Sequence, residues 1–231
     1  MNYKFDFSFL WDPENVYWRD LFHGAWLTIQ LSLVAILFGF LIGTGLALVR
    51  TGRHAGLRRA VAIYVEVIRN TPVLVQTFWL FFGLASMGLK LTAFMAAVIA
   101  LSFNVAAYTS EIIRGGIESV RQGQIEAAES LGLSRASLLF DVILPPAIER
   151  VLPSLSSQFV LLMLATSIMA QISVEDVMAA ASRIQSETFR GFEIYITVAV
   201  IYVVLSILLR WVFRAIGWLA FPRRRRLGTT L

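Results

Sequence analysis

The sequence predicts an all-α membrane protein with five membrane-crossing helices. Hydrophobic residues make up 58% of the 231 residues and charged residues only 15%. The mean hydropathy of +0.72 is far more apolar than that of a soluble domain. The apolar residues gather in stretches of about 20, the length that crosses a bilayer as a helix. Helices are expected because a chain inside lipid must satisfy its own backbone hydrogen bonds.

Five apolar stretches are candidates for crossing the membrane. They cover residues 25–49, 72–89, 91–113, 151–172 and 194–219. The first stretch is too long, and too far behind the polar residues 12–20, to be a cleaved signal peptide, so we expect it to stay in the protein. The whole chain, residues 1–231, is predicted to form one transmembrane domain.

The basic residues predict how these spans are oriented. Cytoplasmic loops are enriched in Lys and Arg, and fifteen of the twenty basic residues fall on one side of the five spans. Because five crossings put the termini on opposite sides, we expect the N-terminus outside and the C-terminus in the cytoplasm. The fifteen are Arg50, Arg53, Arg58, Arg59, Arg69, Arg114, Arg121, Arg135, Arg150, Arg210, Arg214 and Arg223 to Arg226, and the other five are Lys4, Arg19, Lys90, Arg183 and Arg190.

The composition excludes several classes of site. There is no cysteine, which excludes disulfides, thiolate catalysis and Cys-ligated metals. The two histidines, His23 and His54, are far apart in the sequence, so no metal site is expected. No nucleophile–base pair or phosphate-binding glycine loop is present, so the chain is not expected to be an enzyme or to hold a cofactor. The basic residues lie at span ends, where lipid headgroups explain them better than nucleic acid.

One polar segment between the spans predicts a helical hairpin. It contains Glu126, Ala127 and Ala128, then Gly132, then Leu144 and Pro145. The alanines keep one helix face thin, Gly132 can take the left-handed conformation that ends a helix, and Ser134 can cap the next one. Pro145 and Pro146 are expected to end that second helix. The predicted orientation places this coupling hairpin, at about residues 115–150, in the cytoplasm as a docking element.

The hairpin and three further strings resemble a known family. The strings are TIQLSL at 28–33, VIRNTPVLVQ at 67–76 and AAYTSEIIRGGI at 106–117. Together with the hairpin, which resembles the cytoplasmic EAA loop, they are similar to permease subunits of ABC importers for polar amino acids, of the histidine, glutamine and arginine type. The family commonly carries a lysine-aspartate pair before Thr166, where this chain has Leu164 and Ala165.

The resemblance implies a fold and a set of partners. It implies the type I ABC importer permease fold and a location in the bacterial inner membrane as a multi-pass protein. It also implies a second permease subunit, either the same or homologous, ATPase subunits that bind ATP and Mg²⁺, and an extracytoplasmic binding protein that delivers an amino acid. The residues expected to couple to the ATPase are Glu126, Ala127, Ala128, Gly132, Leu144 and Pro145.

Polar side chains inside the spans are candidates for the substrate path. Asn104 lies near the middle of the third span and Tyr108 one helical turn later on the same face. Gln158, Thr166 and Ser167 lie in the fourth span. Such groups are costly in lipid unless they face protein, water or substrate. The structural alternative is a hydrogen bond between helices for Asn104 and a bond to the preceding turn for Thr166 and Ser167.

Three other features carry expectations. Glu111 and Arg114 are predicted to form a charged pair with a structural role near the cytoplasmic end of the third span. Thr71 and Pro72 are predicted to start a helix, with Thr71 capping, and to separate an interfacial helix at 57–69 from the second span. Residues 174–193 are expected to form a short surface helix outside the cell, a candidate surface for an external partner.

The sequence therefore favours a permease subunit of an ATP-driven amino-acid importer. The first alternative is a stand-alone secondary carrier or channel, which five spans without an inverted repeat and without a mid-membrane carboxylate make less favourable. The second alternative is a membrane scaffold whose hairpin recruits a soluble partner without transport. Uptake that depends on ATP hydrolysis distinguishes the three.

Overall fold

The protein is built from helices, as the sequence predicts. The computed structural model describes residues 4–12, 17–52 and 54–220, and no β-strand occurs among them. Arg53 and Arg223 to Arg226, on which the predicted orientation partly depends, lie outside the described residues.

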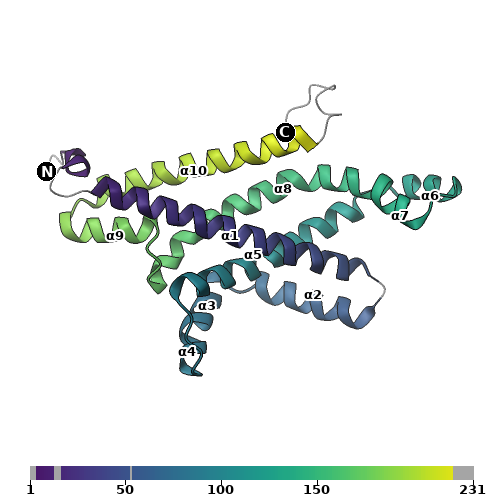
Figure 1. Cartoon of the computed structure of the whole chain (residues 1–231), viewed down its shortest axis with the longest axis horizontal. Coiled ribbons are helices and arrows are strands. Elements are labelled where there is room, and N and C mark those ends of the chain that lie inside the picture. Colours follow the sequence, from purple (N-terminus) through teal and green to yellow (C-terminus); the bar gives the residue numbers. More distant parts are fainter. Residues whose placement is uncertain (1–3, 13–16, 53, 221–231) are drawn as a thin grey trace. The chain divides into compact units, whose positions relative to one another are not determined.

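Figure 1 shows the order of the helices. They are a 3-10 turn at Ser8–Trp11, α1 at Tyr17–Thr51, α2 at Ala55–Arg69, α3 at Val73–Phe78, a π-helical turn at Trp79–Gly83, α4 at Leu84–Ser86, α5 at Ala93–Glu118, α6 at Gln122–Ser130, α7 at Arg135–Ser137, a π-helical segment at Leu138–Ile143, α8 at Leu144–Ala165, a 3-10 segment at Thr166–Ile172, α9 at Val177–Thr188 and α10 at Gly191–Ala220.

Four helices are long and apolar enough to cross a membrane. They are Tyr17–Thr51, Ala93–Glu118, Arg135–Ile172 and Gly191–Leu219. The second predicted stretch forms only the shorter apolar helix Val73–Ser86. At about 1.5 Å per residue this helix reaches roughly 20 Å, against a hydrocarbon core of about 30 Å. The structure therefore confirms the helical membrane class, and four of the five predicted stretches form helices of membrane-crossing length.

The break before Val73–Ser86 is present, but its details differ from the prediction. Pro72 itself is the N-cap of α3, with ψ of 135°, and no side chain caps the helix. The hydroxyl of Thr71 instead donates to the carbonyl of Val67 at 2.9 Å, in the last turn of α2. The prediction that Thr71 caps α3 was therefore wrong. The reason is that the end of α2 leaves carbonyl groups without helical partners, and the Thr71 hydroxyl binds one of them.

The chain divides into two compact units, each drawn from separate parts of the sequence. The first unit comprises residues 1–37, 72–102 and 161–208, and the second comprises residues 38–71, 103–160 and 209–231. The long helices α1, α5, α8 and α10 each contribute to both units.

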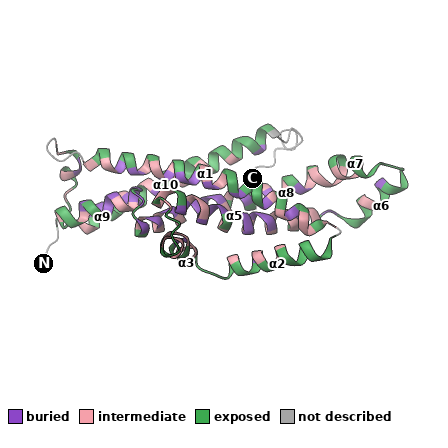
Figure 2. Ribbon diagram, turned by 60° about the horizontal axis from the view of Figure 1, so that its bottom comes forward, coloured by how far each residue is buried: buried purple, intermediate pink, exposed green. Residues whose placement is uncertain are grey.

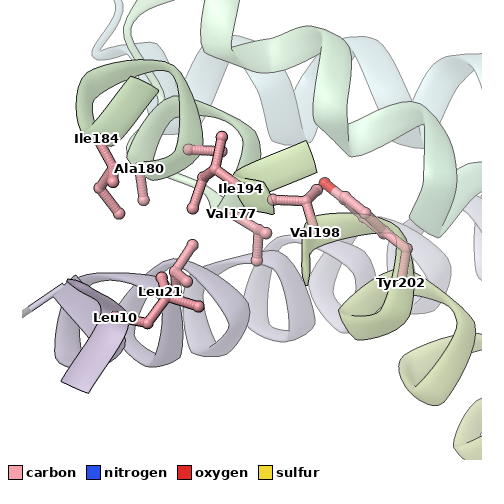
Figure 3. Packing of buried hydrophobic residues seen from close by; sticks show 9 residues of the cluster. Leu10, Leu21, Val177, Ala180, Ile184, Ile194, Val198 and Tyr202 are labelled. Carbon is pink, nitrogen blue, oxygen red and sulfur yellow. The ribbon is translucent and has the colours of Figure 1, made fainter. Parts of the chain in front are cut away.

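The core of the first unit joins its N-terminal turn to α1, α9 and α10. Figure 3 shows eight labelled members of this apolar cluster. They are Leu10, Leu21, Val177, Ala180, Ile184, Ile194, Val198 and Tyr202. Gly24 allows α1 to approach α9, because a Cβ atom at this position would lie 2.8 Å from backbone atoms of Asp176. Burial of these side chains fixes α9 against the first turns of α1 and α10.

The second unit is held by close helix contacts. Gly43 of α1 lies against α5, where an added Cβ atom would be 2.7 Å from the carbonyl oxygen of Ala106. The ring of Phe159 on α8 contacts Phe40 of α1 at 6.4 Å and Phe213 of α10 at 5.3 Å between centroids. Small residues at a helix crossing are typical of membrane proteins, where close packing replaces the hydrophobic effect. Gly43 therefore serves helix packing in the first span.

Burial differs among the helices. Figure 2 shows much of α5 as buried, whereas α2 and α6 are largely exposed. In the most apolar window of each span, 56% of the α5 residues are buried, against 28% for α1 and for α10. The exposed apolar faces of α1 and α10 are suited to contact with lipid, because lipid tails, unlike water, solvate apolar side chains.

Candidate functional site

The coupling hairpin has the local geometry that its sequence predicts. Gly132 is in the left-handed conformation with φ of +70°. The N–H groups of Gly132 and Leu133 donate to the carbonyls of Glu129 and Ala128 at 2.9 and 3.3 Å, which is the Schellman ending of α6. The hydroxyl of Ser134 accepts from the N–H of Ser137 at 3.2 Å and caps α7. The turn is therefore fixed by its own sequence.

A hollow of about 680 Å³ lies inside the coupling hairpin. Ala127, Ala128 and Pro145 line it, together with Gln124, Leu131, Leu133, Asp141, Val142, Pro146 and Glu149. Three of the expected coupling residues thus lie at this hollow, whereas Glu126, Gly132 and Leu144 are not among its described lining residues. Ala128 is buried, while Glu126 and Ala127 are exposed. The hollow combines apolar side chains with two carboxylates.

The prolines do not end the second helix of the hairpin, which corrects the prediction. The helix runs without interruption from Arg135 to Ile172, and Pro145 and Pro146 lie in the first turn of α8. The segment before them, Leu138–Ile143, is π-helical. A π-helical turn is wider than an α-helical one and shifts the hydrogen-bond pattern by one residue. We attribute the tolerance of the prolines to this segment, since it relieves the clash of their rings with the preceding turn.

The stem of the coupling hairpin joins α5 to α8 directly. The guanidinium of Arg150 donates to the hydroxyl oxygen of Ser119 at 2.8 Å and also to the carbonyl oxygen of Ser119. Beside it, Gly116 lies against Val151 and against the carbonyl of Ala147, so closely that no side chain fits between the helices. In Figure 1, α6 and α7 lie beyond these joined ends of α5 and α8. The stem contacts therefore hold the ends of both helices together at the base of the hairpin.

An ion network ties α5 to α1 in the same unit. Glu111 pairs with Arg50 of α1 and with Arg114 of α5, and Arg114 also pairs with Glu118. The predicted Glu111–Arg114 pair is confirmed. The sequence did not predict its partner Arg50, which lies 61 residues away in the chain. With its charges satisfied by opposite charges, the network is suited to holding helices together.

Three of the candidate substrate-path residues lie in the second unit. Asn104 and Tyr108 share one face of α5, and Gln158 lies on α8; all three are partly buried. The guanidinium of Arg69, at the end of α2, lies over the ring of Tyr108 at 5.3 Å, a cation–π contact. Tyr64 donates to the carbonyl oxygen of Phe103 at 2.7 Å and also ties α2 to α5.

The other two candidates, Thr166 and Ser167, lie in the first unit. Thr166 is fully buried and donates to the carbonyl of Met163 at 2.7 Å. Ser167 donates to the carbonyl of Leu164, also at 2.7 Å. Both hydroxyls therefore bond to the preceding turn, which is the structural alternative considered for them. The two sets of candidates belong to separate units, and each stays a prediction.

A buried carboxyl group is the main polar feature that the sequence did not reveal. Asp176 was expected on an exposed surface helix, but it is fully buried. It caps α9 by accepting from the N–H of Ala179 at 3.0 Å, and it accepts from the hydroxyl of Tyr202 at 3.3 Å. Burial raises the pKa of this carboxyl to about 6, although these hydrogen bonds lower it. Its position before an apolar helix is an N-cap pattern, which was the available signal.

Long apolar helices with a polar helical hairpin between two of them are the architecture of a polytopic membrane protein. The family model of the inner membrane component of binding-protein-dependent transport systems matches residues 17–217. The chain belongs to this family. Among the described residues no group of three or more His, Asp or Glu side chains gathers at a potential metal site.

Similar proteins and solved structures indicate which kind of transport subunit the chain resembles. The chain is 33% identical to the octopine transport system permease protein OccM of Rhizobium radiobacter, over 96% of this chain and 92% of that one. It is 38% identical to the probable glutamine ABC transporter permease protein GlnM of Bacillus subtilis, over 87% and 91%. A crystal structure of an amino acid ABC transporter with histidines covers 93% of this chain and 99% of its own, at 35% identity and a TM-score of 0.85. The chain of an inward-facing MetNI methionine ABC transporter shares the fold, with a TM-score of 0.71 and 20% identity.

These comparisons confirm the resemblance drawn from the sequence. The chain is a multi-pass membrane protein and a transmembrane permease subunit of an ABC importer, with the type I fold. Its relatives are transport permease subunits. Membership in the family implies an ABC ATPase and a substrate-binding protein as partners.

Proposed function

We propose that this subunit moves an amino acid or a close derivative across the bacterial inner membrane, driven by a separate ATPase that docks on the coupling hairpin. The observation that carries the proposal is the hairpin itself. Leu131 and Phe140 on it are 80% and 64% exposed, in a segment that also carries the charged residues Glu126, Glu129, Arg135 and Asp141. Large apolar side chains in water indicate a partner surface. The alanines leave room for close approach, and Asp141 and Glu149 favour a partner with basic groups at this hollow.

The route of coupling runs through the stem. When ATP binding closes the ATPase, the hairpin moves, and the Arg150–Ser119 contact carries the displacement into α5 and α8. The Glu111–Arg50 pair extends it to α1. The inward-open and outward-open states must differ in these contacts for the ATPase to bias the equilibrium between them. ATP and Mg²⁺ are bound by the partner, and this chain contributes no catalytic group.

The substrate class is an amino acid or derivative. Relatives are named as permeases for octopine, glutamine and L-cystine, which all carry amino-acid groups. Asn104, Tyr108 and Gln158 are proposed to border the path, since these side chains can hydrogen-bond a polar substrate. Thr166 and Ser167 are proposed to shape the path through the conformation of their helix turn, because both hydroxyls already donate to backbone carbonyl oxygens.

The topology is proposed to comprise five crossings, with the N-terminus outside. The helix Val73–Ser86 would complete its crossing with the irregular backbone on either side, which is tolerated at membrane depth only where it lines a cavity or is buried in protein. A second permease subunit, the same or homologous, would form the other half of the path. The external binding protein would dock on the side of residues 174–193.

Cysteine labelling tests this topology. The chain contains no cysteine, so a single cysteine at Asn15 or Thr229, both outside the described residues, reports one side only. We expect a membrane-impermeant reagent to label position 15 in intact spheroplasts and position 229 only after lysis. Labelling of position 229 from outside would contradict the proposed five crossings.

Reconstituted vesicles test the function. The permease, its ATPase and its binding protein are combined in vesicles, and uptake of radiolabelled amino acids is measured with ATP or with a non-hydrolysable analogue. We expect uptake only with ATP hydrolysis and only with the binding protein present. Uptake driven by an ion gradient without the ATPase would identify a secondary carrier, and ATPase docking without uptake would identify a scaffold.

A further inference from the structure

A small basic hollow lies between α8 and α10 in the second unit. It has a volume of about 140 Å³ and is lined by Pro153, Ser156, Ser157, Arg210, Phe213 and Arg214 among others. Arg210 and Arg214 are one helical turn apart, so both guanidinium groups leave the same face of α10. None of the residues that line this hollow belongs to the coupling hairpin or to the proposed substrate path.

The two arginines have no carboxylate partner among the described residues. Both are exposed, and neither forms an ion pair with a carboxylate in the part of the chain that the structure describes. They lie within the long apolar helix Gly191–Leu219. A guanidinium group on a membrane-crossing helix is costly unless water, a headgroup or an opposite charge meets it. This pair therefore requires an anionic or aqueous partner.

The hollow is formed by the packing of the two helices. The ring centroids of Phe159 and Phe213 lie 5.3 Å apart, and this contact holds α8 against α10. Phe213 also lines the hollow. On the α8 side, the helix carries Pro153 in its interior, followed by the hydroxyls of Ser156 and Ser157. The volume corresponds to several water molecules at about 30 Å³ each. It accommodates a phosphate group but not a whole lipid.

We propose that this hollow binds the phosphate headgroup of an anionic phospholipid. Guanidinium groups bind phosphate oxygens through parallel N–H donors, and the serine hydroxyls supply further donors. Next to the arginines, Trp211 and Val212 are 59% and 53% exposed, which gives the acyl chains an apolar surface. Trp211 is also the amphipathic type of side chain that lies at headgroup depth. With the proposed orientation, the hollow faces the cytoplasmic leaflet, where anionic headgroups attract basic side chains.

Lipid titration of the intact transporter complex tests the site. The complex is delipidated in detergent and titrated with phosphatidylglycerol or phosphatidylcholine, and bound lipids are counted by native mass spectrometry. We expect one tightly retained phosphatidylglycerol per permease chain. Each basic side chain at an anionic lipid contributes roughly fivefold to affinity. The double variant Arg210→Gln with Arg214→Gln should therefore bind about 25-fold more weakly.

Control variants separate this site from general charge effects. Arg58→Gln with Arg59→Gln removes the same charge from exposed positions on α2 and should leave the retained lipid unchanged. If the glutamine double variant fails to assemble, Arg210→Lys with Arg214→Lys keeps the charge but loses the paired donors, and a several-fold weakening is expected. Equal lipid retention in wild type and in the Gln or Lys double variant would overturn the proposal. So would displacement of the lipid by millimolar inorganic phosphate, which would assign the hollow to free phosphate.

Discussion

The hydroxyl of Tyr202 on α10 donates a hydrogen bond of 3.3 Å to Oδ2 of Asp176, the residue that caps α9. Both side chains belong to the packed end of the first unit. The bond joins a helix that crosses the membrane to a short helix outside the spans. Because the carboxyl is fully buried, its ionisation has consequences for stability.

We predict that the stability of this part of the protein falls as the pH rises from about 4 to 6. The Asp176 pKa is about 6 in the folded protein, against 3.8 for the unperturbed group. Between these values the folded state holds a proton that the unfolded state has released, so stability is greatest at the acidic end. The full cost above pH 6 is on the order of 3 kcal/mol. Thermal unfolding in detergent at several pH values measures it.

Asparagine at this position provides the test. Asp176→Asn keeps the N-cap and the acceptor for Tyr202 but removes the charge, so its unfolding temperature should be flat over this pH range and no lower than wild type at pH 7. Asp176→Ala removes the charge and also the cap, so it should be less stable than Asp176→Asn by about 1 kcal/mol. Glu175→Gln, an exposed neighbour, is the control. A pH dependence that survives in Asp176→Asn would assign it to another group.

A matched pair of glycines tests the packing of α1 on α5. A Cβ atom at Gly43 would lie 2.7 Å from the Ala106 carbonyl oxygen, whereas Gly45 has open space around it. Gly43→Ala should therefore destabilise the permease by about 1–3 kcal/mol through overpacking. Gly45→Ala should be neutral or stabilising by up to about 1 kcal/mol, since alanine favours a helix. Unfolding temperatures in one detergent measure both, and equal shifts would argue against the close approach.

The sequence predicted the features that depend on local chemistry. The turn at Gly132, the cap at Ser134 and the Glu111–Arg114 pair each need only neighbouring residues, and the structure contains all three. The short helix within residues 174–193 was likewise found at Val177–Thr188. Hydropathy alone predicted the long helices, because the thickness of the bilayer determines their length.

Other features depend on how helices pack and were not predictable. The Arg150–Ser119 contact joins residues 31 apart, and nothing in either residue's neighbourhood indicates it. The burial of Asp176 likewise follows from the approach of α1 at Gly24. Pro145 and Pro146 misled the prediction because their effect depends on the π-helical segment before them. Helix-breaking rules assume a regular α-helix upstream of the proline.

The left-handed turn at Gly132 predicts a sharp loss of coupling when the glycine is replaced. Nothing lies within 4 Å of an added Cβ atom there, but φ is +70°, so any effect acts through the backbone. Gly132→Val should abolish ATPase association, because β-branched residues strongly disfavour this conformation. Gly123→Val, in α6 and also in open space, is the control. Glu126→Ala removes only an exposed charge and should weaken association modestly. Co-purification of the ATPase at matched permease levels measures all three, and full association in Gly132→Val would remove the main support for the docking role.

Arg150 is predicted to transmit motion without contributing to docking. Arg150→Gln removes a charged hydrogen bond to Ser119, worth about 1–2 kcal/mol where it is exposed. We expect the ATPase to co-purify normally and to hydrolyse ATP, while the amount of substrate taken up per ATP falls several-fold. Ser119→Ala keeps the backbone carbonyl and should show a smaller loss. If both variants keep the normal ratio of uptake to hydrolysis, the stem contact is structural only.

Asn104 and Tyr108 are predicted to border the substrate path. Asn104→Leu keeps the volume and removes the amide, and Tyr108→Phe keeps the ring that stacks under Arg69 and removes the hydroxyl. If these polar groups contact substrate, each variant should weaken transport affinity by about threefold to tenfold, since a single hydrogen bond contributes about 0.5–1.5 kcal/mol. Selectivity among amino acids should change as well. Uptake kinetics in vesicles, with assembly checked by ATPase co-purification, measure the effect. Phe103→Leu, an exposed neighbour on α5, is the control. Unchanged affinity and selectivity in both variants would assign Asn104 and Tyr108 to helix packing.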